Sequence, residues 1–216
     1  MRTIVAAAIA LLACAGLLAC AGWPAVAADQ LPAGTYTLDK AHASLIFRVD
    51  HLGFSHYTAR FTRLDATLEL DPARPAEARL EATVEAASLA TDNPPPGFED
   101  MLRGPEWLDA KAYPQITFRS TEVATTGPDT AWITGDFSLH GVTRPLVLDA
   151  TFNGGYAGHP MDPNARIGFS AYGTLNRSEY GIAYGIPAPG TTMGVSDAVE
   201  IVIEAEFNGP PWAAAP

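Results

Sequence analysis

An alternation of apolar and polar residues with a period of two constrains this chain more than any other feature. It is clearest in residues 79–86, where leucine, alanine and valine alternate with arginine, glutamate and threonine. It returns in residues 199–207, where only Val202 breaks the alternation. Because successive side chains of a strand point to opposite faces, the pattern predicts strands with one face in water and one face in the core.

Further segments of this kind lie between clusters of glycine, proline, asparagine and aspartate, which favour turns. Residues 98–110 and 177–180 differ, and each is predicted to form a short helix or a turn between strands. The predicted strands are 35–39, 43–50, 57–70 with a possible bend, 79–86, 115–124, 131–140, 145–153, 166–175 and 199–207.

The predicted fold class is therefore all-β, with about eight antiparallel strands. Such a meander must protect its edge strands, and closure into a barrel does this most completely. A barrel of about eight strands is either filled by its own side chains or just wide enough for one small or elongated ligand. A two-sheet sandwich with a solid core is the alternative, and periodicity alone does not separate the two.

The amino terminus has the pattern of an export signal. Arg2 supplies one positive charge, residues 3–19 carry none, and Pro24 precedes small residues that end at Ala28. We therefore predict a signal peptide at residues 1–28, one domain at residues 29–216, and a periplasmic or secreted protein. Two alternatives stay open, namely an uncleaved membrane anchor and a lipoprotein that is anchored through Cys20.

Cleavage after Ala28 would remove both cysteines, Cys14 and Cys20. The exported chain of 188 residues could then form no disulfide and would rely on a hydrophobic core. It would carry 12 Lys and Arg against 24 Asp and Glu, a net charge of −12 with histidine neutral. We expect no nucleic-acid partner, because an acidic protein repels the phosphate backbone.

Five phenylalanines lie in the middle of predicted strands, with apolar residues two positions away. Their side chains are predicted to point inward in a barrel and in a sandwich alike. Inward aromatic residues are ordinary core residues, so composition alone does not identify a ligand site. The five are Phe47, Phe61, Phe118, Phe137 and Phe169.

Four segments carry more specific information. The first contains Tyr36-Thr37-Leu38-Asp39, His42-Ala43-Ser44-Leu45-Ile46-Phe47 and His51-Leu52-Gly53-Phe54-Ser55. The second contains Leu102-Arg103, Trp107-Leu108-Asp109 and Tyr113-Pro114-Gln115-Ile116-Thr117-Phe118. The third, which is the most specific, is Gly135-Asp136-Phe137-Ser138-Leu139-His140-Gly141-Val142-Thr143-Arg144-Pro145. The fourth contains Gly168-Phe169 and Asn176-Arg177-Ser178-Glu179-Tyr180-Gly181.

In sequence and order, these segments resemble the YceI-like family of exported bacterial proteins, whose members are described as polyisoprenoid or lipid binding. They cover nearly all of residues 34–207. The resemblance implies an extended, eight-stranded antiparallel β-barrel similar to lipocalins, with a long apolar channel. The implied ligand is a polyisoprenoid or a similar long-chain lipid, including a quinone-like molecule.

The inward side chains and the family motifs together define the candidate ligand contacts. One departure from the family pattern lies beside them, where Phe98-Glu99 replaces an Arg-Asp pair and Gly104 replaces a serine. This change predicts a different headgroup preference, because a fixed cation is lost and apolar surface is gained. The candidate contacts are His42, Phe47, Val49, His51, Phe61, Phe98, Phe118, Phe137, Phe169 and Arg177.

Histidines raise the question of a metal. His42 and His51 are nine residues apart, which places them on opposite faces of a straight strand, so a shared site would need a bulge between them. We predict no metal and no cofactor, and expect polar contacts to a ligand headgroup or structural hydrogen bonds instead. For Arg177 the alternatives are a headgroup clamp, an ion pair with Glu179, or a cap on a strand end.

The sequence favours a binding protein over an enzyme. It contains no G-x-S-x-G elbow, no H-E-x-x-H motif and no phosphate-binding glycine loop. The expected function is an exported carrier of an isoprenoid or another long-chain lipid. A solid-core structural or stress protein and a hydrolase are the alternatives. A homodimer is possible, and loops 153–165 and 181–194 are either lids or plain surface.

Overall fold

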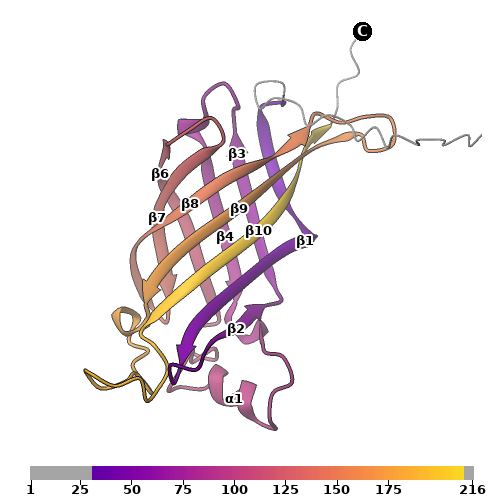
Figure 1. Ribbon diagram of the computed structural model, residues 1–216. Helices are drawn as coiled ribbons and strands as arrows, with labels where there is room; N and C mark the ends of the chain where they lie inside the picture. Colours follow the sequence, from indigo (N-terminus) through magenta and orange to yellow (C-terminus); the bar gives the residue numbers. More distant parts are fainter. Residues whose placement is uncertain (1–30, 212–216) are drawn as a thin grey trace, which may run out of the picture.

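The structure is a computed structural model that describes residues 31–211 (Figure 1). The predicted signal peptide, with Cys14 and Cys20, lies outside the described residues. The described part consists mainly of strands, with one α-helix, α1 (Phe98–Arg103), and short 3₁₀ turns at Pro75–Glu77, Ala86–Ser88 and Arg177–Tyr180. No helix within residues 31–211 has both the length and the apolar character that crossing a bilayer requires.

Ten strands are found in residues 31–211, and every pair of adjacent strands is antiparallel. They are β1 (Gly34–His51), β2 (Ser55–Phe61), β3 (Leu64–Leu70), β4 (Arg79–Glu85), β5 (Leu89–Ala90), β6 (Gln115–Thr125), β7 (Thr130–Leu139), β8 (Val142–Tyr156), β9 (Asn164–Asn176) and β10 (Ala198–Pro211).

The sheet closes into a barrel because β10 pairs with β1. Eight strands form the closed ring, in the order β1, β10, β9, β8, β7, β6, β4 and β3. The short strands β2 and β5 lie outside this ring, with β2 paired to the second half of β1 and β5 paired to β2. The predicted eight-stranded, lipocalin-like barrel is confirmed, and the sandwich alternative is wrong.

Two strand boundaries differ from the prediction. The segments 35–39 and 43–50 form the single strand β1, in which a bulge between Leu38 and Ala43 places the four residues 39–42 opposite the single residue Glu206 of β10. Asp39 Oδ1 accepts a hydrogen bond of 3.1 Å from the backbone N–H of Ala41 and so stabilises this bulge. The predicted bend in 57–70 is a full break at residues 62–63, between β2 and β3.

Ser88 explains why the strand breaks at residues 62–63. The backbone N–H of Thr62 donates to the carbonyl of Ser88 at 3.1 Å, and the N–H of Arg63 donates to Ser88 Oγ at 3.1 Å. Because these two N–H groups bond to Ser88, they cannot form hydrogen bonds with β1, and the pairing of the strand with β1 stops here. The break frees the second half of β1 to pair with β2 near α1, at one end of the barrel (Figure 1).

A solid plug of side chains fills the end of the barrel opposite α1. Its centre is Tyr36, which is fully buried and whose hydroxyl donates to the carbonyl of Pro32 at 2.7 Å. Burial raises the pKa of Tyr36 to about 12. We call the following buried residues the plug: Leu31, Tyr36, Leu38, Leu68, Ala165, Ile167, Ala205 and Phe207.

Gly209 is required by the plug, and its substitution by alanine is expected to destabilise the protein. A Cβ atom at Gly209 would overlap the ring of Tyr36, which is enclosed on all sides. Overpacking of this kind costs about 1–3 kcal/mol. Urea unfolding of Gly209→Ala should show that loss, whereas Gly168→Ala is a matched control because the atom nearest to its Cβ lies 3.9 Å away. Equal stabilities for the two variants would contradict the prediction.

Candidate functional site: an apolar cavity in the barrel

Between the plug and α1 the barrel encloses a cavity of about 670 Å³. This volume lies within the range of about 300–1,000 Å³ that is typical of small-molecule sites. The cavity is lined by inward side chains of the ring strands, by β2, and by the segment from Asp92 to Leu108. Most of the lining residues are apolar. The interior therefore contains a cavity between its two ends, which favours a binding protein over the alternative of a solid core.

The cavity has an inner end and a mouth. At the inner end its lining includes Leu38, Ala205 and Phe207, which belong to the plug. At the other end the lining includes exposed residues, among them His51 and Met101. The mouth therefore lies where α1, the β1–β2 turn and the loop after β9 come together (Figure 1).

Eight of the ten predicted contact residues line the cavity. Six of them lie on strands, where the two-residue period keeps their side chains on the inner face. On β1 this brings Phe47, Val49 and His51 in a row toward the mouth. The rings of Phe47 and Phe61 lie 5.6 Å apart across β1 and β2. The eight are Phe47, Val49, His51, Phe61, Phe98, Phe118, Phe137 and Arg177.

The other two predicted contacts lie outside the cavity lining. His42 is exposed on the outer face of β1, where the bulge ends, and its side chain meets Asp39 instead. Phe169 points inward but packs at the plug, with its ring 5.5 Å from that of Phe152 and 6.2 Å from that of Phe207. The strand is regular from Ala43 to His51, so His42 and His51 lie on opposite sides of the barrel wall and do not form one site.

Arg177 is a buried cation at the mouth end of the cavity, only 4% exposed. It donates hydrogen bonds of 2.8–2.9 Å to four backbone carbonyls, and these bonds take the place of an ion pair with Glu179, one of the three alternatives for this residue. Burial lowers the pKa of its guanidinium. The side chain therefore holds the segment after β9 against the barrel end. The four carbonyls belong to Ile182, Tyr184, Val195 and Ser196.

Trp107 is a lining residue that sequence reasoning missed. The guanidinium carbon of Arg177 lies 5.1 Å from the centre of its ring, and the ring of Tyr184 meets it edge-on at 5.6 Å. Its indole Nε1 is buried and has no hydrogen-bond partner among the described residues. Its spacing from Leu102 in the sequence indicated only that it packs on one face of a short helix. That pattern does not predict that Trp107 lines the cavity.

The helix α1 is fixed to the barrel by Glu99, one of the residues that depart from the family pattern. Its carboxylate accepts a hydrogen bond of 2.7 Å from the backbone N–H of Thr91 and one of 2.9 Å from the guanidinium of Arg103. The Thr91 hydrogen bond lowers the pKa of Glu99. The neighbouring Phe98 lines the cavity, and its ring lies edge-on to that of Tyr57 at 6.3 Å. Of the pair Phe98-Glu99, Glu99 thus attaches α1 to the barrel, and Phe98 lines the cavity.

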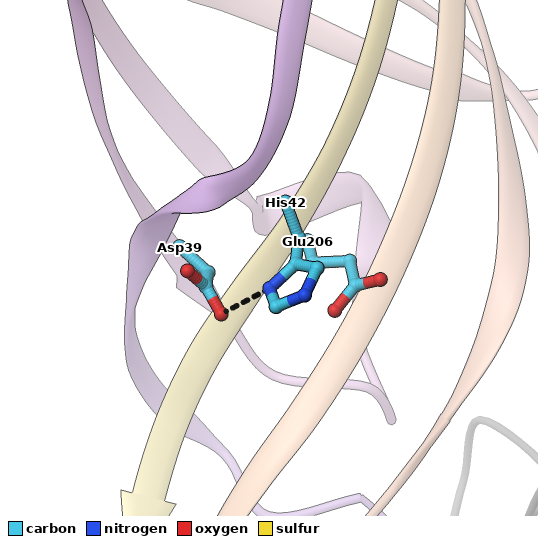
Figure 2. Close-up of side chains that lie close together, drawn as sticks. All are labelled: Asp39, His42 and Glu206. Carbon is cyan, nitrogen blue, oxygen red and sulfur yellow. Dashed lines mark hydrogen bonds and ion pairs between the residues drawn. The ribbon is translucent and has the colours of Figure 1, made fainter.

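A polar cluster on the outer wall brings together Asp39, His42 and Glu206 (Figure 2). His42 Nδ1 lies 3.0 Å from Asp39 Oδ2. Arg166 Nη1 lies 2.7 Å from Asp39 Oδ2 and 3.0 Å from Glu206 Oε2, so one guanidinium is already paired with both carboxylates. Burial opposes the charge of Arg166, but these hydrogen bonds outweigh it and raise its pKa. The arrangement favours an ion-pair network over a metal site.

Asp39 is expected to make stability depend on acid pH. Hydrogen bonds from His42 and then Arg166 lower the pKa of Asp39 to about 2, below its ordinary value of about 3.9. Its charge therefore stabilises the fold above about pH 4, and this contribution disappears as the pH falls toward 2. Urea unfolding from pH 7 to pH 2.5 should show a smaller loss of stability for Asp39→Asn than for the native chain.

The matched control for this pH prediction is Asp65→Asn. Asp65 pairs with Lys40 at 2.6 Å, but both side chains are more than 60% exposed. Exposed pairs contribute little, about 0–1 kcal/mol. Parallel curves for Asp39→Asn and the native chain over this pH range would show that the cluster does not stabilise the barrel.

Comparison with known proteins agrees with this architecture. The model of the YceI-like domain matches residues 36–207. A UPF0312 protein of Pseudomonas savastanoi pv. phaseolicola is 36% identical over 176 residues, which cover 80% of this chain and 86% of the relative. A UPF0312 protein of Pseudomonas putida W619 is 35% identical over 183 residues, which cover 83% of this chain and 90% of the relative.

Two solved structures have a similar barrel. The YceI protein of Campylobacter jejuni has 28% sequence identity and a TM-score of 0.63, over 74% of this chain and 90% of that one. A polyisoprenoid binding domain from Saccharophagus degradans has a TM-score of 0.61, over 81% of this chain and 98% of that one. With 15% identity, the second likeness is one of fold alone. By the extent of the domain match and by these relatives, the chain belongs to the YceI-like family.

Proposed function

We propose that this protein binds one long-chain lipid, a polyisoprenoid or a quinone-like molecule, in the apolar cavity of the barrel. The observation that carries the proposal is the cavity itself, about 670 Å³ in volume and lined mainly by apolar side chains. A core without a ligand would gain stability by filling this space. The Saccharophagus degradans domain, whose name says that it binds polyisoprenoid, supports the idea that this fold can hold such a chain.

Affinity would come chiefly from the tail of the ligand. Each methylene group that leaves water contributes about 0.8 kcal/mol, without any need for polar recognition. The phenylalanine rings that line the cavity provide the matching apolar surface. Shape and length of the tail would then decide how much of the lining is covered.

Selection of a headgroup would occur at the mouth. His51 and Trp107 both lie in the lining there, and the indole N–H of Trp107 is a buried donor without an acceptor in the described part of the chain. An unpaired buried donor costs about 1–3 kcal/mol, so a small movement of the neighbouring side chains that lets a ligand oxygen accept from it would be favoured. Arg177 lies beside this donor but already holds four carbonyls.

We propose an exported carrier, because residues 1–28 have the pattern of a signal peptide. Lipidation of Cys20 would tether the carrier to a membrane instead. The mass of the mature amino terminus distinguishes the two forms. A chain that begins at residue 29 supports the diffusing carrier, whereas one that begins with an acylated Cys20 supports the tethered form.

The experiment that tests binding is native mass spectrometry of the purified protein, followed by extraction into organic solvent. A stoichiometric apolar molecule, released chemically unchanged, is expected. Its reproducible absence, together with failure to take up an added isoprenoid quinone, would overturn the proposal. Release of a hydrolysed molecule would favour an enzyme.

Replacement of Phe98 by arginine should change which lipid copurifies. Phe98 lines the cavity at the mouth, so the change replaces apolar surface with a fixed cation. A cation favours anionic headgroups. The lipid extract of Phe98→Arg should shift toward lipids with phosphate or carboxylate groups, with Met101→Leu as a size-conserving control at the same end. An unchanged profile would remove Phe98 from headgroup selection.

A further inference from the structure

Three large apolar side chains are exposed around the mouth of the cavity. Phe54 is 81% exposed, Met193 is 72% exposed and Met101 is 45% exposed. We call these residues the apolar rim. They come from the β1–β2 turn, the loop after β9 and α1, which meet at one end of the barrel (Figure 1). Exposed apolar groups that gather at one place usually mark an interaction surface.

Phe54 is held outward by a tight turn. Leu52 and Gly53 both have positive φ values, 57° and 72°, and the N–H of Phe54 donates to the carbonyl of His51 at 2.9 Å. Positive φ values at both central residues of a turn match the twist of a hairpin, and Phe54 is the last residue of the loop before Ser55 pairs with His51. The geometry of this turn requires no phenylalanine at the position after Gly53. The large ring is therefore presented to solvent without a structural need.

The turn is tied to the loop that carries Met193. The N–H of Leu52 donates to the carbonyl of Gly194 at 2.8 Å, and a Cβ atom added at Gly53 would lie 3.2 Å from the side chain of Thr192. The two segments that carry Phe54 and Met193 are therefore adjacent. A flat partner such as a bilayer surface could contact both side chains at once.

The apolar rim borders the entrance to the cavity. Met101 belongs both to the rim and to the lining, and His51 and Val195, which form an isolated bridge, also line the cavity. A surface that covers the rim would thus join the cavity directly. A lipid could then pass between that surface and the barrel with little exposure of its tail to water.

Two polar contacts lie near the rim. Asp50 Oδ1 lies 2.6 Å from His56 Nδ1, and Arg60 forms an ion pair with Asp92 at 3.3 Å. The whole chain carries a net charge of −11. The protein therefore has no excess of cations with which to attract an anionic membrane, and contact has to rely on apolar insertion.

From this juxtaposition we infer that the mouth of the barrel docks on a zwitterionic phospholipid bilayer, with Phe54 and Met193 inserted, and exchanges its ligand there. The inference rests on the proposed function, because it names the source of the bound lipid. Insertion of two such side chains supports weak, reversible contact rather than permanent anchoring.

Flotation with phosphatidylcholine vesicles tests the docking without any cavity ligand. The double variant Phe54→Glu/Met193→Glu should reduce the vesicle-bound fraction of the exported chain, which begins at residue 29, by about tenfold or more. The matched control is Trp132→Glu/Met161→Glu, which adds the same charge at residues that are 54% and 83% exposed away from the mouth. This control should float like the native chain. Addition of phosphatidylglycerol should weaken binding by the native chain.

A second measurement separates docking from the proposed function. Uptake of a fluorescent long-chain fatty acid from aqueous solution should be equal in both double variants, whereas its transfer from vesicles should slow only in Phe54→Glu/Met193→Glu. Equal flotation of all three proteins would overturn the docking, even if uptake from solution persists. Flotation that needs anionic lipid, or a native dimer that only the rim variant dissociates, would overturn it as well. Docking without uptake would instead contradict the cavity function.

Discussion

Replacement of Ala82 by tryptophan is expected to weaken lipid binding by about two orders of magnitude. Ala82 lies in the middle of β4, lines the cavity, and pairs across the sheet with Ala66 and Phe118. An indole ring at this position would occupy space that the tail of the ligand needs. Exclusion of about four methylene groups costs about 3 kcal/mol, which is about a hundredfold in affinity.

The fold should survive this change, because the ring enters an existing cavity rather than a packed core. Titration with an isoprenoid quinone and urea unfolding measure the two quantities separately. Thr83→Trp is the control, since Thr83 is the next residue of β4 and points to the opposite face. Native affinity in Ala82→Trp would show that the ligand binds elsewhere. A loss of similar size in Thr83→Trp would point to general damage of the sheet.

Replacement of Arg177 by methionine is expected to cost about 3 kcal/mol of folding stability. The change removes the donors of four buried or partly buried backbone hydrogen bonds at one end of the barrel. A buried carbonyl that loses its partner costs about 1–3 kcal/mol, and relief from burying a charge offsets part of the sum. The segment 181–197 should detach first, so limited proteolysis should cut there before the barrel unfolds.

Two further variants test whether this loss of stability comes from the four hydrogen bonds of Arg177. Arg177→Lys keeps the charge, but a single ammonium group cannot reach four carbonyls that the planar guanidinium spans, so an intermediate loss is expected. Arg144→Ala is the control, because Arg144 donates one 2.9 Å bond to the carbonyl of Glu179 in an exposed position. A stability of Arg177→Met within about 0.5 kcal/mol of that control would show that the four bonds contribute little.

The sequence predicted the wall of the barrel well, because the side-chain alternation of a strand is a local property. The strands and their inner faces followed from the two-residue period, and Phe47, Phe61, Phe118 and Phe137 line the cavity as that period requires. Because the period is a local property, it also explains why Phe169 was wrongly predicted to line the cavity. Phe169 has the same pattern as Phe47, yet it packs at the plug with Phe207.

The site at the mouth could be predicted only in part, because it is assembled from distant segments. Trp107 reaches the cavity from the turn after α1 and meets Tyr184 of the segment after β9. Sequence spacing cannot show such a contact. The family resemblance marked Arg177 as important, but only the fold shows that it holds four carbonyls rather than pairing with Glu179.

By itself the sequence determined that the chain forms an antiparallel, all-β domain with aromatic side chains on its inner face. Only the tertiary structure decided that β10 closes on β1, and that Tyr36 fills one end while the other end stays hollow. The physical reason is the range of the interactions. Alternation is fixed by neighbours in the chain, whereas the plug depends on contacts such as that of Tyr36 with Gly209, between residues from opposite ends of the barrel sequence.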